Sequence, residues 1–207
     1  MTLFRGYVPT KNKKCLMKFK NQNNLLDLAA ASNLEEYAGI LAENIVLIDV
    51  DDYEQSEILM DIVEDLQLRC RVYETSRGKH FLFLNNNKIE KCKTNCKLAI
   101  GLKSDIKLGS RNSYSILKYE NIERKIIYDI FEDEEYEEIP TWLIPIKSNI
   151  DFLNMDVGDG RNQTLFNYIL TLQSASFAIE EIRETLRIIN KYVLKEPLSD
   201  SELETIL

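Results

Sequence analysis

The first 130 residues combine short apolar runs with one helical repeat. The continuous apolar run Ile45–Ile48 predicts a buried strand over residues 45–51, and apolar residues at helical spacing from Ile58 to Leu66 predict a helix directly after it. A shorter helix is predicted in residues 23–32, with Asn23 or Asn24 as its cap. Other strands are predicted at residues 4–8, 71–74, 80–84, 97–102, 104–109, 113–119 and 124–131. One helix followed by several strands favours a domain with a mixed or antiparallel sheet, in the α+β class.

The pattern becomes helical from about residue 155. Apolar residues recur at helical spacing after Asn162 and again over residues 178–193, and Ser199 or Asp200 is placed to cap a third helix. We therefore expect two domains, at residues 1–150 and 151–207. The chain ends within the third predicted helix, so we interpret the second domain as a truncated part of a longer protein.

Composition narrows the class of protein. Hydrophobic residues make up 44% of the 207 positions, no apolar run is long enough to span a bilayer, and the N-terminus lacks the apolar core of a signal peptide. Four cysteines in a chain of this size do not form a disulfide framework. These features predict a cytoplasmic protein with no membrane partner.

Charge is distributed unevenly around a net value of −8. Residues 69–111 contain eleven Lys or Arg against three acids, and the first twenty residues contain six basic residues and no acid. Residues 120–138 contain nine acids and two bases. A basic segment is expected of a phosphate-binding surface, and a solvated surface of mixed charge is the alternative.

Carboxylates end the predicted strand at residues 45–51. Residues two apart in a strand share a face, so Asp49 and Asp51 project together, as do Asp105 and Lys107 in another predicted strand. If the two strands are neighbours, three carboxylates and a lysine meet in one place. Such a set suits Mg²⁺ together with substrate phosphates. An Asp pair at a strand end also occurs in phosphatases, in nucleases and as a turn cap; Asp52 is expected to cap the following helix.

A polar, basic turn precedes the strand that begins at His80, the only histidine of the chain. Its residues are Thr75, Ser76, Arg77, Gly78 and Lys79. Hydroxyl groups, Arg, Lys and exposed backbone N–H groups are the usual ligands of phosphate. A purely structural histidine at the start of a strand is the alternative.

The order of these motifs resembles a known family. An Asp-x-Asp strand end, a Ser-x-x-x-His stretch and an Asp-x-Lys strand, in that order, resemble the archaeo-eukaryotic primase superfamily, and in particular the primase-polymerase domain of phage and plasmid replication proteins. The resemblance covers roughly residues 4–150 and implies an RRM-like mixed sheet. It implies that two Mg²⁺ or Mn²⁺ ions are held by Asp49, Asp51 and Asp105. It also implies that the incoming nucleotide is bound by Ser76, Arg77, Lys79, His80 and Lys107.

The helical module is similar to the C-terminal helix bundle of such primases, which has Gly-Arg-Asn before its first helix, as at residues 160–162. This implies binding of the template or of the initiating nucleotide; a simple helix start is the alternative. The family implies a DNA primase/polymerase that performs template-directed nucleotidyl transfer on single-stranded DNA. Its implied partners are nucleoside triphosphates and a helicase, in the host cytoplasm if the protein is encoded by a phage.

Several alternatives stay open. The same acids would serve a metal-dependent nuclease or phosphatase, and a non-catalytic DNA-binding module of a replication initiator is a third interpretation. Cys92 and Cys96 have the spacing of half a zinc site, although the two remaining cysteines make a weak set of partners. Arg111 and Asn112 follow the third acid, where the family often has glycines, and their contact with substrate is left undecided.

Overall fold

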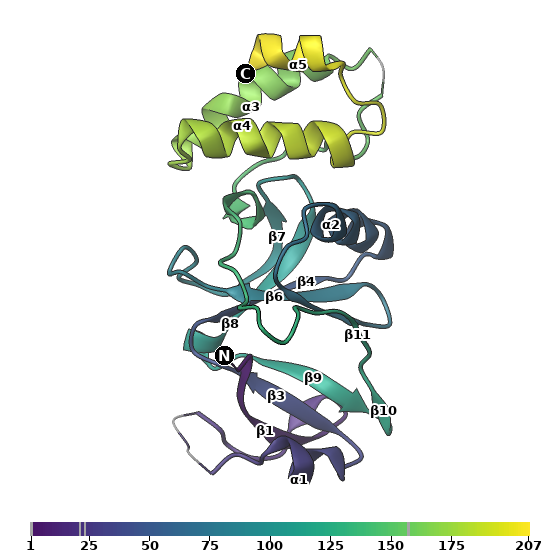
Figure 1. Ribbon diagram of the computed structural model, residues 1–207, viewed down its shortest axis with the longest axis vertical. Helices are drawn as coiled ribbons and strands as arrows, with labels where there is room; N and C mark the ends of the chain where they lie inside the picture. Colours follow the sequence, from purple (N-terminus) through teal and green to yellow (C-terminus); the bar gives the residue numbers. More distant parts are fainter. Residues whose placement is uncertain (1, 21, 23, 157) are drawn as a thin grey trace. The chain divides into compact units, whose positions relative to one another are not determined.

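The computed structural model describes all residues except 1, 21, 23 and 157, and the chain forms two compact units. Unit 1 comprises Met1–Tyr53, Leu68–Thr94 and Asp105–Ile139, and unit 2 comprises Glu54–Gln67, Asn95–Ser104 and Pro140–Leu207. Neither unit is a single stretch of the chain. The described residues form two antiparallel sheets and five α-helices, which confirms the α+β class (Figure 1).

Unit 1 contains strands of both sheets. The five-stranded sheet has the order β10-β9-β3-β1-β2, with strands β1 (Phe4–Lys11), β2 (Lys14–Cys15), β3 (Tyr37–Leu41), β9 (Tyr114–Tyr119) and β10 (Ile122–Glu123). The larger sheet contributes the order β11-β5-β6-β4-β8, with strands β4 (Ile45–Val50), β5 (Arg71–Glu74), β6 (Lys79–Leu84), β8 (Lys103–Leu108) and β11 (Ile126–Tyr128). The helix α1 (Leu28–Ser32) and the short turn η1 (Gly109–Arg111) complete the named elements of this unit.

The core of unit 1 lies between its two sheets. Ile45 and Leu47 of β4 pack there with Leu82 of β6, and they meet Leu41 and Leu117 from the five-stranded sheet. All six residues of β4 are buried, as the continuous apolar run predicts. Because alternate residues share a face, the face that carries Leu47 also carries Asp49. The first acid of the candidate site is therefore placed at the end of the space between the sheets.

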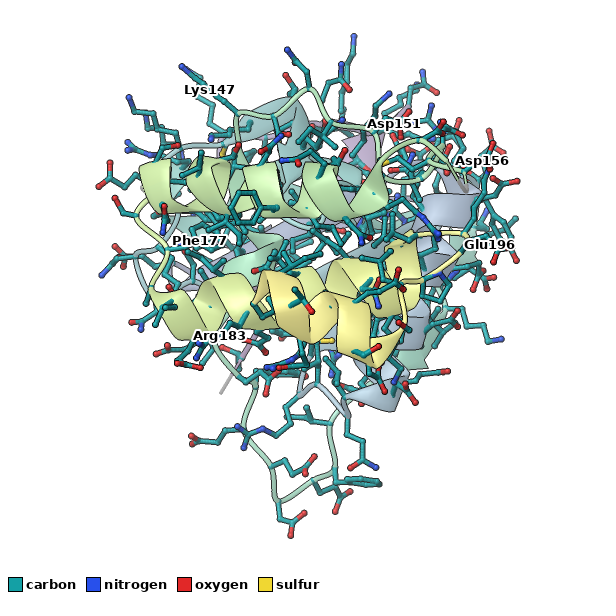
Figure 2. All side chains as sticks on the ribbon, turned by 90° about the horizontal axis from the view of Figure 1, so that it is seen from above. Lys147, Asp151, Asp156, Phe177, Arg183 and Glu196 are labelled. Atoms are coloured by element: carbon teal, nitrogen blue, oxygen red, sulfur yellow. The ribbon has the colours of Figure 1, made fainter. Side chains whose placement is uncertain are left out.

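Unit 2 is mostly helical. It contains most of α2 (Tyr53–Asp65), together with α3 (Arg161–Ser174), α4 (Ile179–Ile188), the π-helical turn η3 (Ile189–Val193), α5 (Asp200–Ile206) and the short turn η2 (Thr141–Leu143). Strand β12 (Pro145–Ile146) pairs with the end of β7 (Lys93–Leu98). Helices α3 and α4 lie side by side, joined by a turn near Phe177 (Figure 2). No helix in the described part of the chain is long and apolar enough to span a lipid bilayer.

The predicted C-terminal helices are present. Ser199 caps α5 by accepting a hydrogen bond from the Glu202 backbone, and the Glu202 side chain accepts one from the Ser199 backbone in return. Burial of Tyr168 anchors α3, because its hydroxyl donates to the Ala99 carbonyl at 2.7 Å and its ring packs edge-on against Phe152. These contacts all lie within unit 2.

Two local predictions are wrong, and one strand was missed. Helix α1 is capped by Asp27, whose carboxylate accepts from the Ala30 backbone at 2.8 Å, rather than by Asn24; Asn23 lies outside the described residues. The strand predicted at residues 97–102 ends at Leu98, because Gly101 with φ +93° turns the chain back so that Leu98 and Leu102 pair. Strand β3 was not predicted, since its sequence YAGIL lacks alternation and contains glycine.

Candidate active site

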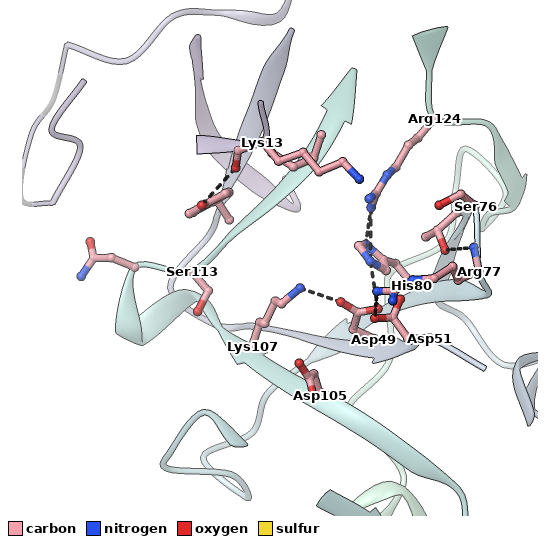
Figure 3. Close-up of a pocket in the computed structure, with 14 residues that line it drawn as sticks. Lys13, Asp49, Asp51, Ser76, Arg77, His80, Asp105, Lys107, Ser113 and Arg124 are labelled. Atoms are coloured by element: carbon pink, nitrogen blue, oxygen red, sulfur yellow. Dashed lines mark hydrogen bonds and ion pairs between the residues drawn. The ribbon is translucent and has the colours of Figure 1, made fainter. Parts of the chain in front are cut away.

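Three neighbouring strands of unit 1 align the central residues of the site. In the register of β4, Asp49 lies opposite His80 of β6 on one side and opposite Asp105 of β8 on the other. Residues directly opposite in an antiparallel sheet project from the same face, so the three side chains form one row. Lys107 follows Asp105 by two residues and shares that face (Figure 3). The sheet thus places residues from three separate sequence motifs next to one another.

Asp49 is a buried carboxylate compensated by cations and by an imidazole. It is 7% exposed; Lys107 Nζ donates to its Oδ2 at 2.6 Å, and His80 Nε2 lies 3.1 Å from its Oδ1. Burial by itself raises the pKa of Asp49, but the His80 ring and the Lys107 ammonium outweigh it and hold the pKa well below its ordinary range. Asp49 is therefore ionised at neutral pH.

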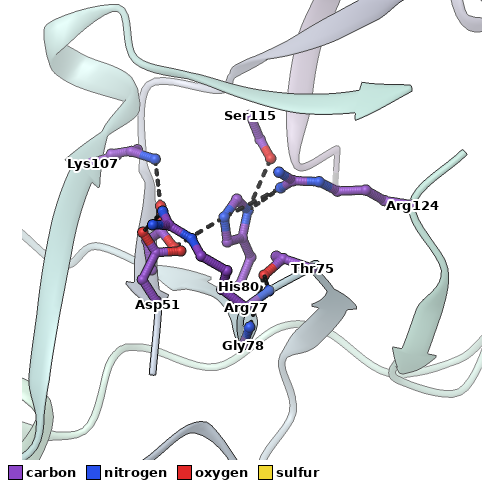
Figure 4. Close-up of polar contacts among 9 residues, drawn as sticks. Asp51, Thr75, Arg77, Gly78, His80, Lys107, Ser115 and Arg124 are labelled. Carbon is purple, nitrogen blue, oxygen red and sulfur yellow. Dashed lines mark hydrogen bonds and ion pairs between the residues drawn. The ribbon is translucent and has the colours of Figure 1, made fainter. Parts of the chain in front are cut away.

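His80 lies between Asp49 and a guanidinium. Arg124 Nη1 is 2.7 Å from His80 Nδ1 and farther, at 3.2 Å, from Nε2, and Ser115 Oγ is 3.2 Å from Nδ1 (Figure 4). A guanidinium can only donate, so Nδ1 accepts and the ring proton lies on Nε2, facing Asp49. Burial lowers the pKa of His80, and the positive charges of Arg124 and Lys107 act in the same direction, so that together they outweigh the opposing effect of the Asp49 carboxylate. His80 is thus a neutral ring of defined tautomer.

The turn at residues 75–78 is fixed against the end of β4. Thr75 Oγ1 accepts from the Gly78 backbone at 3.0 Å and from the Arg77 backbone at 3.3 Å. A Cβ atom on Gly78 would lie 2.0 Å from the Val50 carbonyl oxygen, so only glycine allows this approach. Arg77 forms an exposed ion pair with Asp51, which contributes little to stability and is easily exchanged for another partner.

These residues surround a cavity of about 600 Å³, which we call the charged pocket. Its lining residues are Lys13, Asp49, Asp51, Thr75, Ser76, Arg77, His80, Asp105, Lys107, Asn112, Ser113, Tyr114, Ile116 and Arg124. Seven of the eight predicted site residues are among them. The exception is Lys79, which is buried with its ammonium 5.1 Å from the centroid of the Tyr53 ring. Lys79 precedes His80 in β6 and therefore projects from the opposite face.

Sequence reasoning missed Arg124, Ser115 and Lys13. Ser115 and Lys13 come from β9 and from the β1–β2 turn, and Arg124 follows β10, so all three belong to the five-stranded sheet or to its turns. Lys13 and Arg124 line the pocket, whereas Ser115 is buried and contacts His80. Arg111 and Asn112, whose contact with substrate the sequence left undecided, lie in different places. Arg111 donates to the Glu90 carbonyl at 2.9 and 3.1 Å and holds a surface loop, whereas Asn112 lines the pocket.

The carboxylate oxygens of the site suit a hard divalent cation, provided that the cation displaces the basic side chains that now contact them. Asp49 Oδ1 is a buried oxygen with His80 Nε2 at 3.1 Å, and Asp105 is the register neighbour of Asp49. No group of three or more His, Cys, Asp or Glu is placed together to hold a metal ion in the described part of the chain. Asp49 and Asp51 contact Lys107 and Arg77 instead. A metal ion at these carboxylates would have to replace those cations.

The cysteines make other contacts. Cys92 Sγ lies 3.5 Å from Ser113 Oγ, and Cys96 Sγ contacts the Ser104 carbonyl at 3.2 Å. All four cysteines are free thiols.

Comparison with known proteins gives no matching family model, no matching curated protein and no matching solved structure.

Proposed function

We propose that the chain is a DNA primase-polymerase that performs template-directed nucleotidyl transfer on single-stranded DNA. The observation that supports this most is the row of His80, Asp49 and Asp105 across three strands, which opens into a cavity of about 600 Å³. That volume is in the range of small-ligand sites. The row joins the three motifs whose order resembles the primase superfamily, and the two-sheet unit around it would be a variant of the RRM-like domain.

The phosphates of a nucleoside triphosphate would bind among the basic and hydroxyl groups of the charged pocket. Lys107, Arg124 and Ser76 line it, and each can donate to a phosphate oxygen. Burial lowers the pKa of Arg124, because a buried guanidinium loses contact with water. A bound phosphate would offset this cost by pairing with the positive charge of Arg124. Lys79 has no role in this proposal, since it does not line the pocket.

The carboxylates would hold the divalent ions, Mg²⁺ or Mn²⁺, after Lys107 and Arg77 move to the phosphates. Asp49, with its buried oxygen, and Asp105 beside it are the principal ligands in this proposal, and Asp51 is the third. Such ions, when bound, lower the pKa of the attacking 3′-hydroxyl and offset the charge of the leaving pyrophosphate. His80 would fix the orientation of Asp49 from the side opposite Asp105.

A primer-synthesis assay tests the proposal. The full chain is incubated with single-stranded DNA, labelled nucleotides and Mg²⁺ or Mn²⁺, and the products are separated on a denaturing gel. We expect short oligomers that require both template and metal, and that are lost in Asp105→Asn but retained in Asp133→Asn, an exposed acid of the same unit. Cleavage of the template without synthesis would favour the nuclease alternative. Binding to DNA with neither activity would favour the non-catalytic module.

In this proposal the protein acts in the cytoplasm, during phage or plasmid replication, beside a helicase. The helicase would be a further domain or a separate protein.

A further inference from the structure

A second cavity, of about 430 Å³, adjoins the charged pocket in unit 1. We call it the tyrosine pocket; it is lined by Lys13, Glu74, Thr75, Ser76, Ile116, Tyr119, Glu120, Ile122, Glu123, Arg124 and Lys125. Both cavities share Lys13, Thr75, Ser76, Ile116 and Arg124 as walls. A ligand long enough to pass these shared residues can therefore occupy both.

The tyrosine pocket is the more apolar of the two cavities. Tyr119 and Ile122 supply a ring and an aliphatic side chain, and Ile122 is 73% exposed. The ammonium of Lys13, a wall shared by the two cavities, lies 4.8 Å from the centroid of the Tyr119 ring, so the ring lies beside the shared wall. A flat apolar group on the ligand would remove this surface from water.

The charges of the tyrosine pocket disfavour phosphate. Beyond the shared walls it contains Glu74, Glu120 and Glu123 against a single base, Lys125. Carboxylates repel a phosphate, but they accept hydrogen bonds from hydroxyl and amino groups. The expected occupant is therefore an uncharged, partly aromatic group with several donors, attached to an anion held in the charged pocket.

We propose that the tyrosine pocket binds the base and ribose of the nucleotide whose triphosphate binds the charged pocket. The inference rests on the proposed function, because it assumes that the charged pocket binds a triphosphate. Tyr119 would stack on or beside the base, and the glutamates would accept from sugar hydroxyls or from amino groups of the base. A strand of nucleic acid fits this pocket less well, since its backbone would bring phosphates against the three glutamates.

Calorimetric titration of the full chain separates the two halves of the ligand. The probes are ATP, dATP and inorganic tripolyphosphate, each with Mg²⁺, and the variants are Tyr119→Ala, Tyr119→Phe and Ile122→Asp. Ile126→Asp is the matched control, because Ile126 is an exposed isoleucine of the same unit that does not line the pocket. Ile122 is exposed, so its variant keeps the test valid if Tyr119→Ala fails to fold.

We expect the wild type to bind the nucleotides more tightly than tripolyphosphate. Tyr119→Ala and Ile122→Asp should weaken nucleotide binding roughly 5- to 100-fold while leaving tripolyphosphate binding unchanged, and Tyr119→Phe should retain nucleotide affinity. Equal affinity of the wild type for nucleotides and tripolyphosphate would overturn this inference and leave the proposed function standing. Binding of none of the three probes would overturn both. Weaker binding of a single-stranded oligonucleotide alone in the two variants would instead assign the pocket to the template.

Discussion

His80 is the residue on which the electrostatics of the site depend. It lies between the Asp49 carboxylate and the Arg124 guanidinium, and it is 3% exposed. Its Nδ1 accepts from Arg124, which leaves its ring proton on the Asp49 side. A protonated ring would place a second positive charge against Arg124. The site therefore requires a neutral histidine.

The pH dependence of stability follows from that requirement. Burial lowers the pKa of His80 in the folded chain, so below an unfolded pKa of about 6.5 the unfolded chain binds a proton that the folded chain does not. The free energy of unfolding should therefore fall as the pH drops from 7.5 to 5.5, by no more than about 1.4 kcal/mol per pH unit. Urea unfolding at several pH values measures this slope.

His80→Gln provides the control for the pH prediction, because the chain contains no other histidine. The variant should lose most of the slope between pH 7.5 and 5.5, whatever its absolute stability. Asp49 does not interfere in this window. Its pKa is lowered, so the stability that it contributes is lost only as the pH falls below its ordinary value of about 3.9. An unchanged slope in His80→Gln would contradict a neutral, buried His80.

Arg124 gives a second test at the residue scale. Removal of its charge by Arg124→Gln should weaken nucleoside triphosphate binding about 10- to 100-fold, because a charge-assisted hydrogen bond is worth about 1.5–3 kcal/mol. Calorimetric titration with dATP and Mg²⁺ measures the loss. Arg69→Gln is the control, since the Arg69 side chain is about half exposed and lies in a weak 3.6 Å surface ion pair with Glu137. Equal affinities of the two variants for dATP would show that Arg124 does not bind the triphosphate.

At the scale of elements, the end of β4 and the turn at residues 75–78 behave as one unit. The backbone of Gly78 contacts the Val50 carbonyl so closely that a methyl group has no room. Thr75 closes the turn, and Ser76 and Arg77 then face the pocket beside Asp51. The position of two predicted phosphate ligands is therefore set by a glycine that is not itself among the residues lining the pocket.

Gly78→Ala tests this coupling. The added Cβ must push the turn away from β4, which should cost about 1–3 kcal/mol of unfolding free energy and weaken nucleotide binding in the molecules that remain folded. Urea unfolding and titration with dATP measure the two effects. Ser110→Ala, at an exposed position of another turn in unit 1, should change neither. A stable Gly78→Ala variant with normal affinity would show that the turn is adaptable.

The parts of the site that follow from local rules were predictable from the sequence. The alternation of strand residues places Asp49 with Asp51 and Asp105 with Lys107, and the turn before His80 is visible in its composition. The same alternation should have excluded Lys79 once His80 was assigned to the site. Arg124 could not be predicted, because its approach depends on the pairing of β9 with β3, which are far apart in the sequence. No local pattern encodes that pairing.

At the scale of the whole molecule, the charges are segregated. The net charge of −8 conceals a basic N-terminal segment, in which Lys11, Lys14, Lys18 and Lys20 are exposed. The acidic residues concentrate in residues 120–138. At physiological salt a bound polyanion senses charges only within a Debye length, which is about 8 Å. The net charge of the whole protein is therefore a poor guide to whether it binds DNA. The proposed function requires single-stranded DNA to bind a basic surface of an acidic protein.

Two matched pairs of substitutions separate local charge from net charge. Lys18→Gln with Lys20→Gln, and Lys147→Gln with Lys195→Gln, each take the net charge from −8 to −10, and all four lysines are exposed. If the N-terminal segment contacts the DNA backbone, only the first pair should flatten the dependence of log K on log salt, by about 1.4 for two lost phosphate contacts. Fluorescence anisotropy of a labelled single-stranded oligonucleotide between 50 and 200 mM salt, roughly the range in which such contacts weaken, measures both slopes. Equal slopes for the two pairs would mean that the overall charge, rather than the N-terminal segment, governs DNA binding.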